Sequence, residues 1–244
     1  MFPSRRITTL GGEKLQDQFS VVLDGTDDYV DCGSGSTLDV GSSAFSVSAW
    51  FYPTGNTGDT IVSKGNSLTL GAGWAVSITE NEAIYFDIGD SSNRDITKTA
   101  NSVITLSTWN HVVAVRPSGT TEGRAIYVNG VDITHSNEED VNDCADGSLN
   151  FEIGNSEEGR EFTSHISDVA FYKGIALSAS QVATIYNGRE PYNHAEGVAS
   201  SYLNGWWRMG DGTESGSGST IYDMSGTGNN GTLQENAAFS GFVK

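Results

Sequence analysis

Cysteine and proline are both scarce in this chain. The two cysteines, Cys32 and Cys144, allow at most one disulfide, and neither stands in the Cys-x-x-Cys or Cys/His spacing that zinc requires. We expect two separate free thiols. Only four prolines stand against 30 glycines, and serine, threonine, asparagine and aspartate are frequent. This composition indicates many short strands joined by turns, and continuous helical periodicity is nearly absent.

Positive charge is the second scarcity. Lysine and arginine together number 13, against 31 aspartates and glutamates, which gives a formal net charge of −18 and a pI near 4.3. A surface of this sign repels phosphate backbones and anionic lipids, so neither nucleic acid nor a membrane is an expected partner. Most of these carboxylates are expected to be solvated, and only a cation-binding site would give some of them a specific role as ligands.

Long apolar runs are missing as well. No stretch approaches the length of a membrane span, and residues 1–12 contain two arginines but no apolar signal-peptide core. We therefore expect a chain that is made in the cytoplasm without an export signal. A virion protein that leaves its host by lysis shares this property, as does a leaderless secreted protein or a chain whose signal has been removed.

Two segments carry the strongest strand signals. Residues 109–116 (Trp-Asn-His-Val-Val-Ala-Val-Arg) are rich in valine and end at a Pro-Ser-Gly turn. Residues 124–128 then lead into the pair Asn129-Gly130, which is the strongest short-range signal for a tight hairpin. The two segments therefore predict neighbouring strands of a β-sandwich.

These segments resemble the centre of the laminin-G/pentraxin-like branch of the concanavalin-A-like lectin and glucanase superfamily, where a "W-x-H-V" strand precedes an "i-Y-v-N-G" strand. Residues 22–30 (Val-Leu-Asp-Gly-Thr-Asp-Asp-Tyr-Val), 45–53 and 165–172 resemble further strands in the family's order. The resemblance covers roughly residues 19–190. It implies an all-β, jelly-roll β-sandwich with one short helix near the end of the core domain.

The short helix has start and stop signals of its own. Ser178 and Gln181 stand in capping-box spacing, which predicts a helix N-terminus at Ser178. The pair Asn187-Gly188 predicts its C-terminal stop.

Three parts follow along the chain: a polar docking arm at residues 1–18, the sandwich at 19–190 and a C-terminal extension at 191–244. The extension resembles the hairpin that precedes the first strand in many relatives, displaced to the other end. It can fold back in cis as a circular permutation, complete a neighbouring subunit in trans, or form an independent tail. Because exposed tryptophans are costly, Trp206 and Trp207 are expected to be packed.

Calcium is the one cofactor that the resemblance implies. Asp24 with Asp27 or Asp28, and Asp168 on the closing strand, resemble positions that support structural calcium in relatives, and carboxylates in loops suit this hard cation. The alternative is that these aspartates end turns and accept hydrogen bonds from backbone amides.

A sugar site requires an exposed aromatic platform surrounded by polar groups. The candidate side chains follow the expected strand that ends near residue 65, and they are Trp74, Tyr85, Arg94 and Asn66. For Trp74 the alternative is a place in the core, where Trp50 and Trp109 are also expected.

Patterns for catalysis are missing. The Glu-x-Asp-x-x-Glu strand of the retaining glucanases in this superfamily is absent, as are a Gly-x-Ser-x-Gly turn and a phosphate loop. The acidic clusters at 138–140 and 157–161 lie in Gly- and Asn-rich connections and are expected to be solvated. His111, inside an expected strand, is expected to be packed.

The sequence therefore predicts a non-enzymatic structural or adhesive protein of a virion, such as a capsid decoration or fibre protein of a marine bacteriophage. The segment Trp-Trp-Arg-Met-Gly-Asp at 206–211 resembles C-terminal pieces of marine phage proteins. The expected partners are other virion proteins or copies of the chain itself, with host glycans as further ligands. The alternative is a secreted bacterial carbohydrate-binding or adhesion module outside the cell, and a glycoside hydrolase relative comes third.

Overall fold

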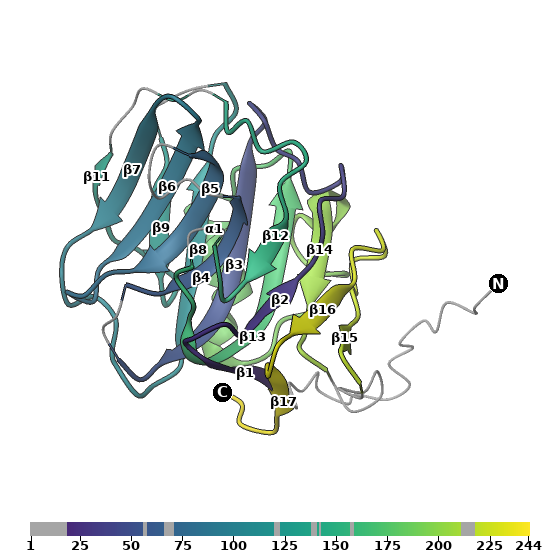
Figure 1. Ribbon diagram of the computed structural model, residues 1–244. Coiled ribbons are helices and arrows are strands. Elements are labelled where there is room, and N and C mark those ends of the chain that lie inside the picture. The colour runs from purple at the N-terminus through teal and green to yellow at the C-terminus, as the bar shows by residue number, and fades with distance from the viewer. Residues whose placement is uncertain are drawn as a thin grey trace.

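The structure is a computed structural model of the chain. It describes residues 19–55, 58–65, 71–119, 123–137, 141, 143–156, 159–210 and 218–244, so the expected docking arm at 1–18 lies outside the described residues. Two antiparallel sheets pack face to face (Figure 1). The predicted all-β sandwich with one short helix is confirmed.

The first sheet is built around the long central strands. Its order is β10 (Val131–Asp132), β9 (Ala125–Val128), β8 (Asn110–Arg116), β3 (Phe45–Pro53), β13 (Thr163–Lys173), β1 (Ser20–Asp24) and β17 (Ala238–Ser240), with β14 (Leu203–Trp207) also paired to β13. The β9–β10 hairpin turns at Asn129 and Gly130, whose φ angles are +51° and +79°. Positive φ at both positions is what the predicted tight hairpin turn requires.

The second sheet carries the other face of the sandwich. Its order is β11 (Thr134–Asn137), β7 (Arg94–Thr99), β6 (Ile84–Asp90), β5 (Ala72–Ile78), β4 (Thr60–Gly65), β12 (Phe151–Ile153), β2 (Tyr29–Asp31), β16 (Gly231–Gln234) and β15 (Thr220–Ile221). Strands β4 and β5 are buried almost throughout, so connections cover part of the outer face of this sheet.

The core between the sheets is strongly aromatic. Trp74 of β5 packs on Phe171 of β13, with ring centroids 5.9 Å apart, and Phe45 and Phe151 surround the pair. Trp50 and Trp109 are buried as expected. Cys32 and Cys144 are buried free thiols, which confirms the prediction of two unpaired cysteines.

The predicted helix is present. Helix α1 (Ala179–Tyr186) begins at Ser178, whose backbone N–H donates to Gln181 Oε1 while its Oγ accepts from the Gln181 N–H, and it ends at Asn187 with a φ of +50°. Its buried residues Val182 and Ile185 pack against the outer face of the first sheet. Two 3₁₀ turns follow, η1 (Asn187–Arg189) and η2 (Ser200–Tyr202). Within the described part of the chain, no helix is long and apolar enough to cross a membrane.

The C-terminal extension adds strands to both sheets of its own chain. Strand β1 pairs with Thr163–Ile166 of β13 and β14 pairs with the later part of the same strand, so β1 and β14 follow one another along one edge of β13. Strands β16 and β17, yellow in Figure 1, pair with β2 and β1. Of the three arrangements open to this extension, the structure has the one in cis. Trp206 and Trp207 are buried, as predicted.

Candidate functional site

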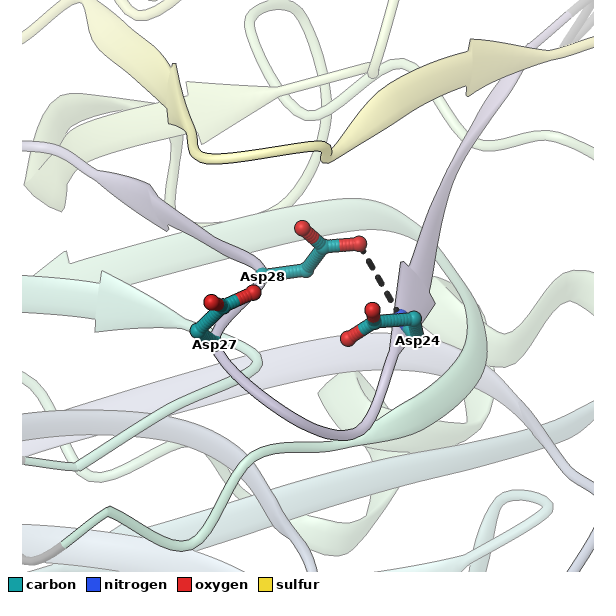
Figure 2. Close-up of side chains that lie close together, drawn as sticks. All are labelled: Asp24, Asp27 and Asp28. Carbon is teal, nitrogen blue, oxygen red and sulfur yellow. Dashed lines mark hydrogen bonds between the residues drawn. The ribbon is translucent and has the colours of Figure 1, made fainter.

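An acidic turn joins β1 to β2. Figure 2 shows the carboxylates of Asp24, Asp27 and Asp28 facing the same space at the mouth of this turn. One carboxylate oxygen from each lies within 4.8 Å of the others, with Asp24 and Asp27 exposed and Asp28 buried. Gly25 adopts a φ of +77°, which lets the chain reverse tightly enough to gather them. Three oxygen donors in this arrangement can bind a metal ion.

Backbone hydrogen bonds hold the same turn. Asp28 Oδ2 accepts from the Asp24 N–H at 3.1 Å, and Asp28 Oδ1 accepts from the Asn236 N–H, between β16 and β17, at 2.7 Å. Asp24 Oδ1 accepts from the Thr26 N–H at 2.8 Å. The expected turn-forming role is therefore present. It is compatible with metal binding, since a carboxylate oxygen has more than one lone pair.

Asp168 lies elsewhere, and the expectation that it joins the acidic turn is wrong. Asp24 pairs with Thr163 of β13, and Asp168 is five positions further along that strand, roughly 17 Å away at the rise of a β-strand. Asp168 sits in a bulge of β13 with a φ of +49°. Its buried carboxylate accepts from Trp206 Nε1 at 2.8 Å and from Lys244 Nζ at 3.0 Å. A buried carboxylate needs such partners, and the C-terminal extension supplies both.

Trp74 is not a sugar platform in this structure. Its side chain is fully buried between the sheets, stacked on Phe171, so neither ring face reaches solvent. This corrects the expectation for Trp74 and agrees with its alternative place in the core. Asn66 lies outside the described residues.

Tyr85 and Arg94 line the same cavity. Tyr85 alternates along β6 with the core residues Ile84 and Phe86, so its side chain stands on the outer face of the second sheet. Tyr85 and Arg94 both line an open cavity of about 640 Å³. Gly25 of the acidic turn lies at the same cavity, so the turn forms part of its rim.

Arg94 is held in place by a buried carboxylate. Its Nε donates to Asp87 Oδ1 at 2.8 Å, and its Nη2 lies 2.5 Å from the same oxygen. The Asp87 side chain is fully buried, whereas about a quarter of the Arg94 side chain is exposed. The pair therefore fixes the plane of a guanidinium that faces the cavity, a geometry suited to paired hydrogen bonds with a ligand.

Further residues that line the cavity come from the connection before β13, from the start of β13 and from the residue before β4. They include Arg160, Glu161 and Thr163, together with Asp59, whose Oδ2 accepts from the Thr163 N–H at 3.1 Å. These residues were not predicted as site residues, and Glu161 was expected to be solvated. No local signal marks them, because contacts between segments far apart in the sequence, such as the hydrogen bond from the Thr60 N–H to the Arg160 carbonyl, bring this connection to the cavity.

A sandwich with a polar cavity on one sheet and an acidic turn at the rim has the architecture of a lectin-like module. The family model of the concanavalin A-like lectin/glucanases superfamily matches residues 24–183, which is 160 of the 244 residues, and the chain belongs to this superfamily. A comparison with curated proteins finds no match.

Solved structures share the fold at low sequence identity. A protein of Bacteroides ovatus, provisionally described as carbohydrate-binding, has a TM-score of 0.63 and 18% identity over 93% of this chain, which spans 60% of that protein. The carbohydrate-binding module CBM40 of a Ruminococcus gnavus sialidase, bound to α2,3-sialyllactose, has a TM-score of 0.57 and 13% identity over 71% of this chain and all of its own. A heptameric pentraxin of Limulus polyphemus has a TM-score of 0.51 and 17% sequence identity. The match covers 75% of this chain and 85% of the pentraxin chain.

Proposed function

We propose that this chain is a non-catalytic carbohydrate-binding module that holds a glycan in the cavity lined by Arg94 and Tyr85. The observation that carries the proposal is the Arg94–Asp87 pair, which fixes a planar donor in a cavity of about 640 Å³ that Tyr85 also lines. A cavity with one aromatic wall and a few fixed polar groups is typical of small-ligand sites.

Each wall has a distinct task in this proposal. The ring of Tyr85 packs on the apolar face of a pyranose, and Arg94 donates hydrogen bonds to adjacent sugar oxygens. Asn81 and Glu161, which also line the cavity, accept hydrogen bonds from sugar hydroxyls. The site therefore suits a sugar that presents both acceptor and donor oxygens along one edge.

Calcium is the metal that we propose for the acidic turn. The three carboxylates supply hard oxygen ligands of the kind that this ion prefers. Because Gly25 belongs to both the turn and the cavity rim, a bound ion would order one side of the sugar site.

The absence of catalysis is part of the proposal and rests on the sequence, which lacks the paired-carboxylate strand of retaining glucanases. Asp59, Glu80 and Glu161 line the cavity, so the alternative of a hydrolase is tested directly. Incubation with laminarin, agarose, carrageenan and bacterial polysaccharides should release no reducing ends. If reducing ends are released and Glu161→Gln abolishes their release, the chain is a hydrolase instead.

The neighbours favour the extracellular bacterial alternative over the virion protein. Two of the neighbours described above are bacterial and are described as carbohydrate-binding, and none of the three is a virion protein. We therefore propose glycans as the partners and the outside of a bacterial cell as the location.

A glycan array tests the proposal with the chain in calcium-containing buffer. We expect binding to a defined set of glycans, lost in Arg94→Gln and weakened in Arg94→Lys, which keeps the charge but not the planar fork. An array without binding, or one that Arg94→Gln leaves unchanged, would exclude this cavity as the sugar site.

A further inference from the structure

A buried ammonium group lies on the outer face of the first sheet, away from the proposed sugar cavity. It belongs to Lys244, whose side chain is only 2% exposed. Its Nζ lies 3.0 Å from Asp168 Oδ2 and 4.3 Å from the centre of the Trp50 ring. One carboxylate and one aromatic face therefore meet the same cation, which is the arrangement that recognises ammonium groups in cation–π sites.

The carboxylate is oriented by groups other than the lysine. The bulge in β13 and the left-handed backbone at Asp168 turn this side chain toward the C-terminal extension. Trp206 Nε1 donates to Asp168 Oδ1 at 2.8 Å, and His194 Nε2 lies 3.6 Å from the same oxygen. The second oxygen, Oδ2, thus remains directed at the ammonium.

The aromatic wall is fixed as well. The Trp50 ring packs on His111, with centroids 4.8 Å apart, and stacks on Tyr186 at 5.7 Å. His111 Nε2 lies 2.8 Å from Ser48 Oγ. Burial, together with the nearby charge of Lys244, lowers the pKa of His111 to about 3, so this ring is neutral. The wall beside the lysine is therefore aromatic and uncharged.

Asp168 supplies the negative charge. Burial alone raises the pKa of this carboxyl, but the charge of Lys244, the nearby His194 ring and the hydrogen bond from Trp206 outweigh burial and hold the pKa well below its usual value. The site thus offers an ionised carboxylate and a π face to a single cation.

We propose that Trp50, Asp168 and Trp206 form a binding site for a primary alkylammonium group, and that the Lys244 side chain fills this site in cis. The site anchors the C-terminal strap, residues 241–244, which follows β17 across the first sheet. Phe242 of the strap packs on Tyr52, with ring centroids 4.8 Å apart, and on Trp109 at 5.9 Å. The anchored strap therefore covers an aromatic row on this face.

Chemical rescue tests the site. Lys244→Ala removes the alkylammonium and leaves the pocket in place, so the melting temperature should fall by roughly 5–10 °C. Adding n-propylammonium chloride should then raise the melting temperature of Lys244→Ala saturably, by mass action. Sodium chloride at equal ionic strength and 1-propanol should not do so. An unchanged melting temperature in Lys244→Ala, or an equal response to 1-propanol, would overturn the proposal.

Two matched variants show where the amine binds. Lys244→Met fills the pocket without a charge and should not respond to n-propylammonium. Lys173→Ala removes a lysine at the end of β13, whose Nζ donates to the Ser36 carbonyl, and should not respond either. A response of either variant equal to that of Lys244→Ala would show that the amine acts elsewhere. Glycan binding on the second sheet should be retained in Lys244→Ala, which separates this test from that of the sugar site.

Discussion

Replacing Trp207 with alanine should destabilise the whole sandwich. Trp207 lies on β14, which pairs with β13 in the first sheet, and packs on Phe151 of β12 in the second sheet, with ring centroids 4.9 Å apart. Its side chain is fully buried, and its Nε1 donates to the Asn229 carbonyl at 2.7 Å. Truncating a buried tryptophan costs about 3–5 kcal/mol, and the lost hydrogen bond adds about 1 kcal/mol.

The expected loss is a large share of the free energy of unfolding, which is typically about 5–15 kcal/mol for a domain. At about 2–4 °C per kcal/mol for a chain of this size, the melting temperature should fall by roughly 10–20 °C. Trp207→Phe is the matched control, because it keeps an aromatic ring against Phe151 and loses the N–H donor. It should cost about 1–2 kcal/mol.

Urea unfolding followed by far-UV circular dichroism measures both variants. A single transition that moves to lower urea in Trp207→Ala, and less in Trp207→Phe, is expected if the C-terminal extension is part of one cooperative unit. If the free energy of unfolding of Trp207→Ala stays within about 1 kcal/mol of that of the native chain, the extension folds apart from the sandwich despite the pairing of β14 with β13.

Two further predictions concern ions and protons. Chelating calcium should lower the melting temperature, because a bound ion stabilises the folded chain by mass action. Asp27→Asn, at an exposed carboxylate of the acidic turn, should remove this response without unfolding the chain. If Asp27→Asn still responds to the chelator, the ion binds elsewhere. The pKa of His111 is about 3 in the folded chain and about 6.5 in the unfolded chain. Between about pH 6.5 and about pH 3, therefore, only the unfolded chain takes up a proton at this residue. Stability should therefore fall by about 1.4 kcal/mol per pH unit below pH 6.5, and His111→Gln should flatten this slope in urea titrations at pH 4–7; an equal slope in both proteins would contradict the assignment.

Local signals explain which parts of the fold were predictable. The Asn129-Gly130 turn and the capping box at Ser178 depend on neighbouring residues alone, so the sequence predicts them at the right positions. The C-terminal extension was recognisable by its tryptophans, but the strands with which it pairs were not. Strand β17 pairs Ser240 with Ser20 from the far end of the chain, and such a contact has no local signal.

The candidate site was predictable only in part. Tyr85 and Arg94 do lie at one cavity, whereas Trp74 faces the core. Strand β5 is buried on both faces for most of its length, so its sequence lacks the alternation that would tell one face from the other. For Asp168, a bulge decides the direction of the side chain, and a bulge depends on the pairing of β13 with β3.

If Tyr85 and Arg94 hold a glycan, removing the Tyr85 ring should raise the dissociation constant of the ligand that binds most strongly on the array. Calorimetric titration should give a dissociation constant at least about tenfold higher for Tyr85→Ala than for the native chain. A tenfold change corresponds to a loss of about 1.4 kcal/mol of binding free energy, which we expect from the lost aromatic packing. Tyr222→Ala, at an exposed tyrosine beside β15 that does not line the cavity, should bind like the native chain. Equal dissociation constants for the native chain and Tyr85→Ala would show that Tyr85 does not hold the glycan.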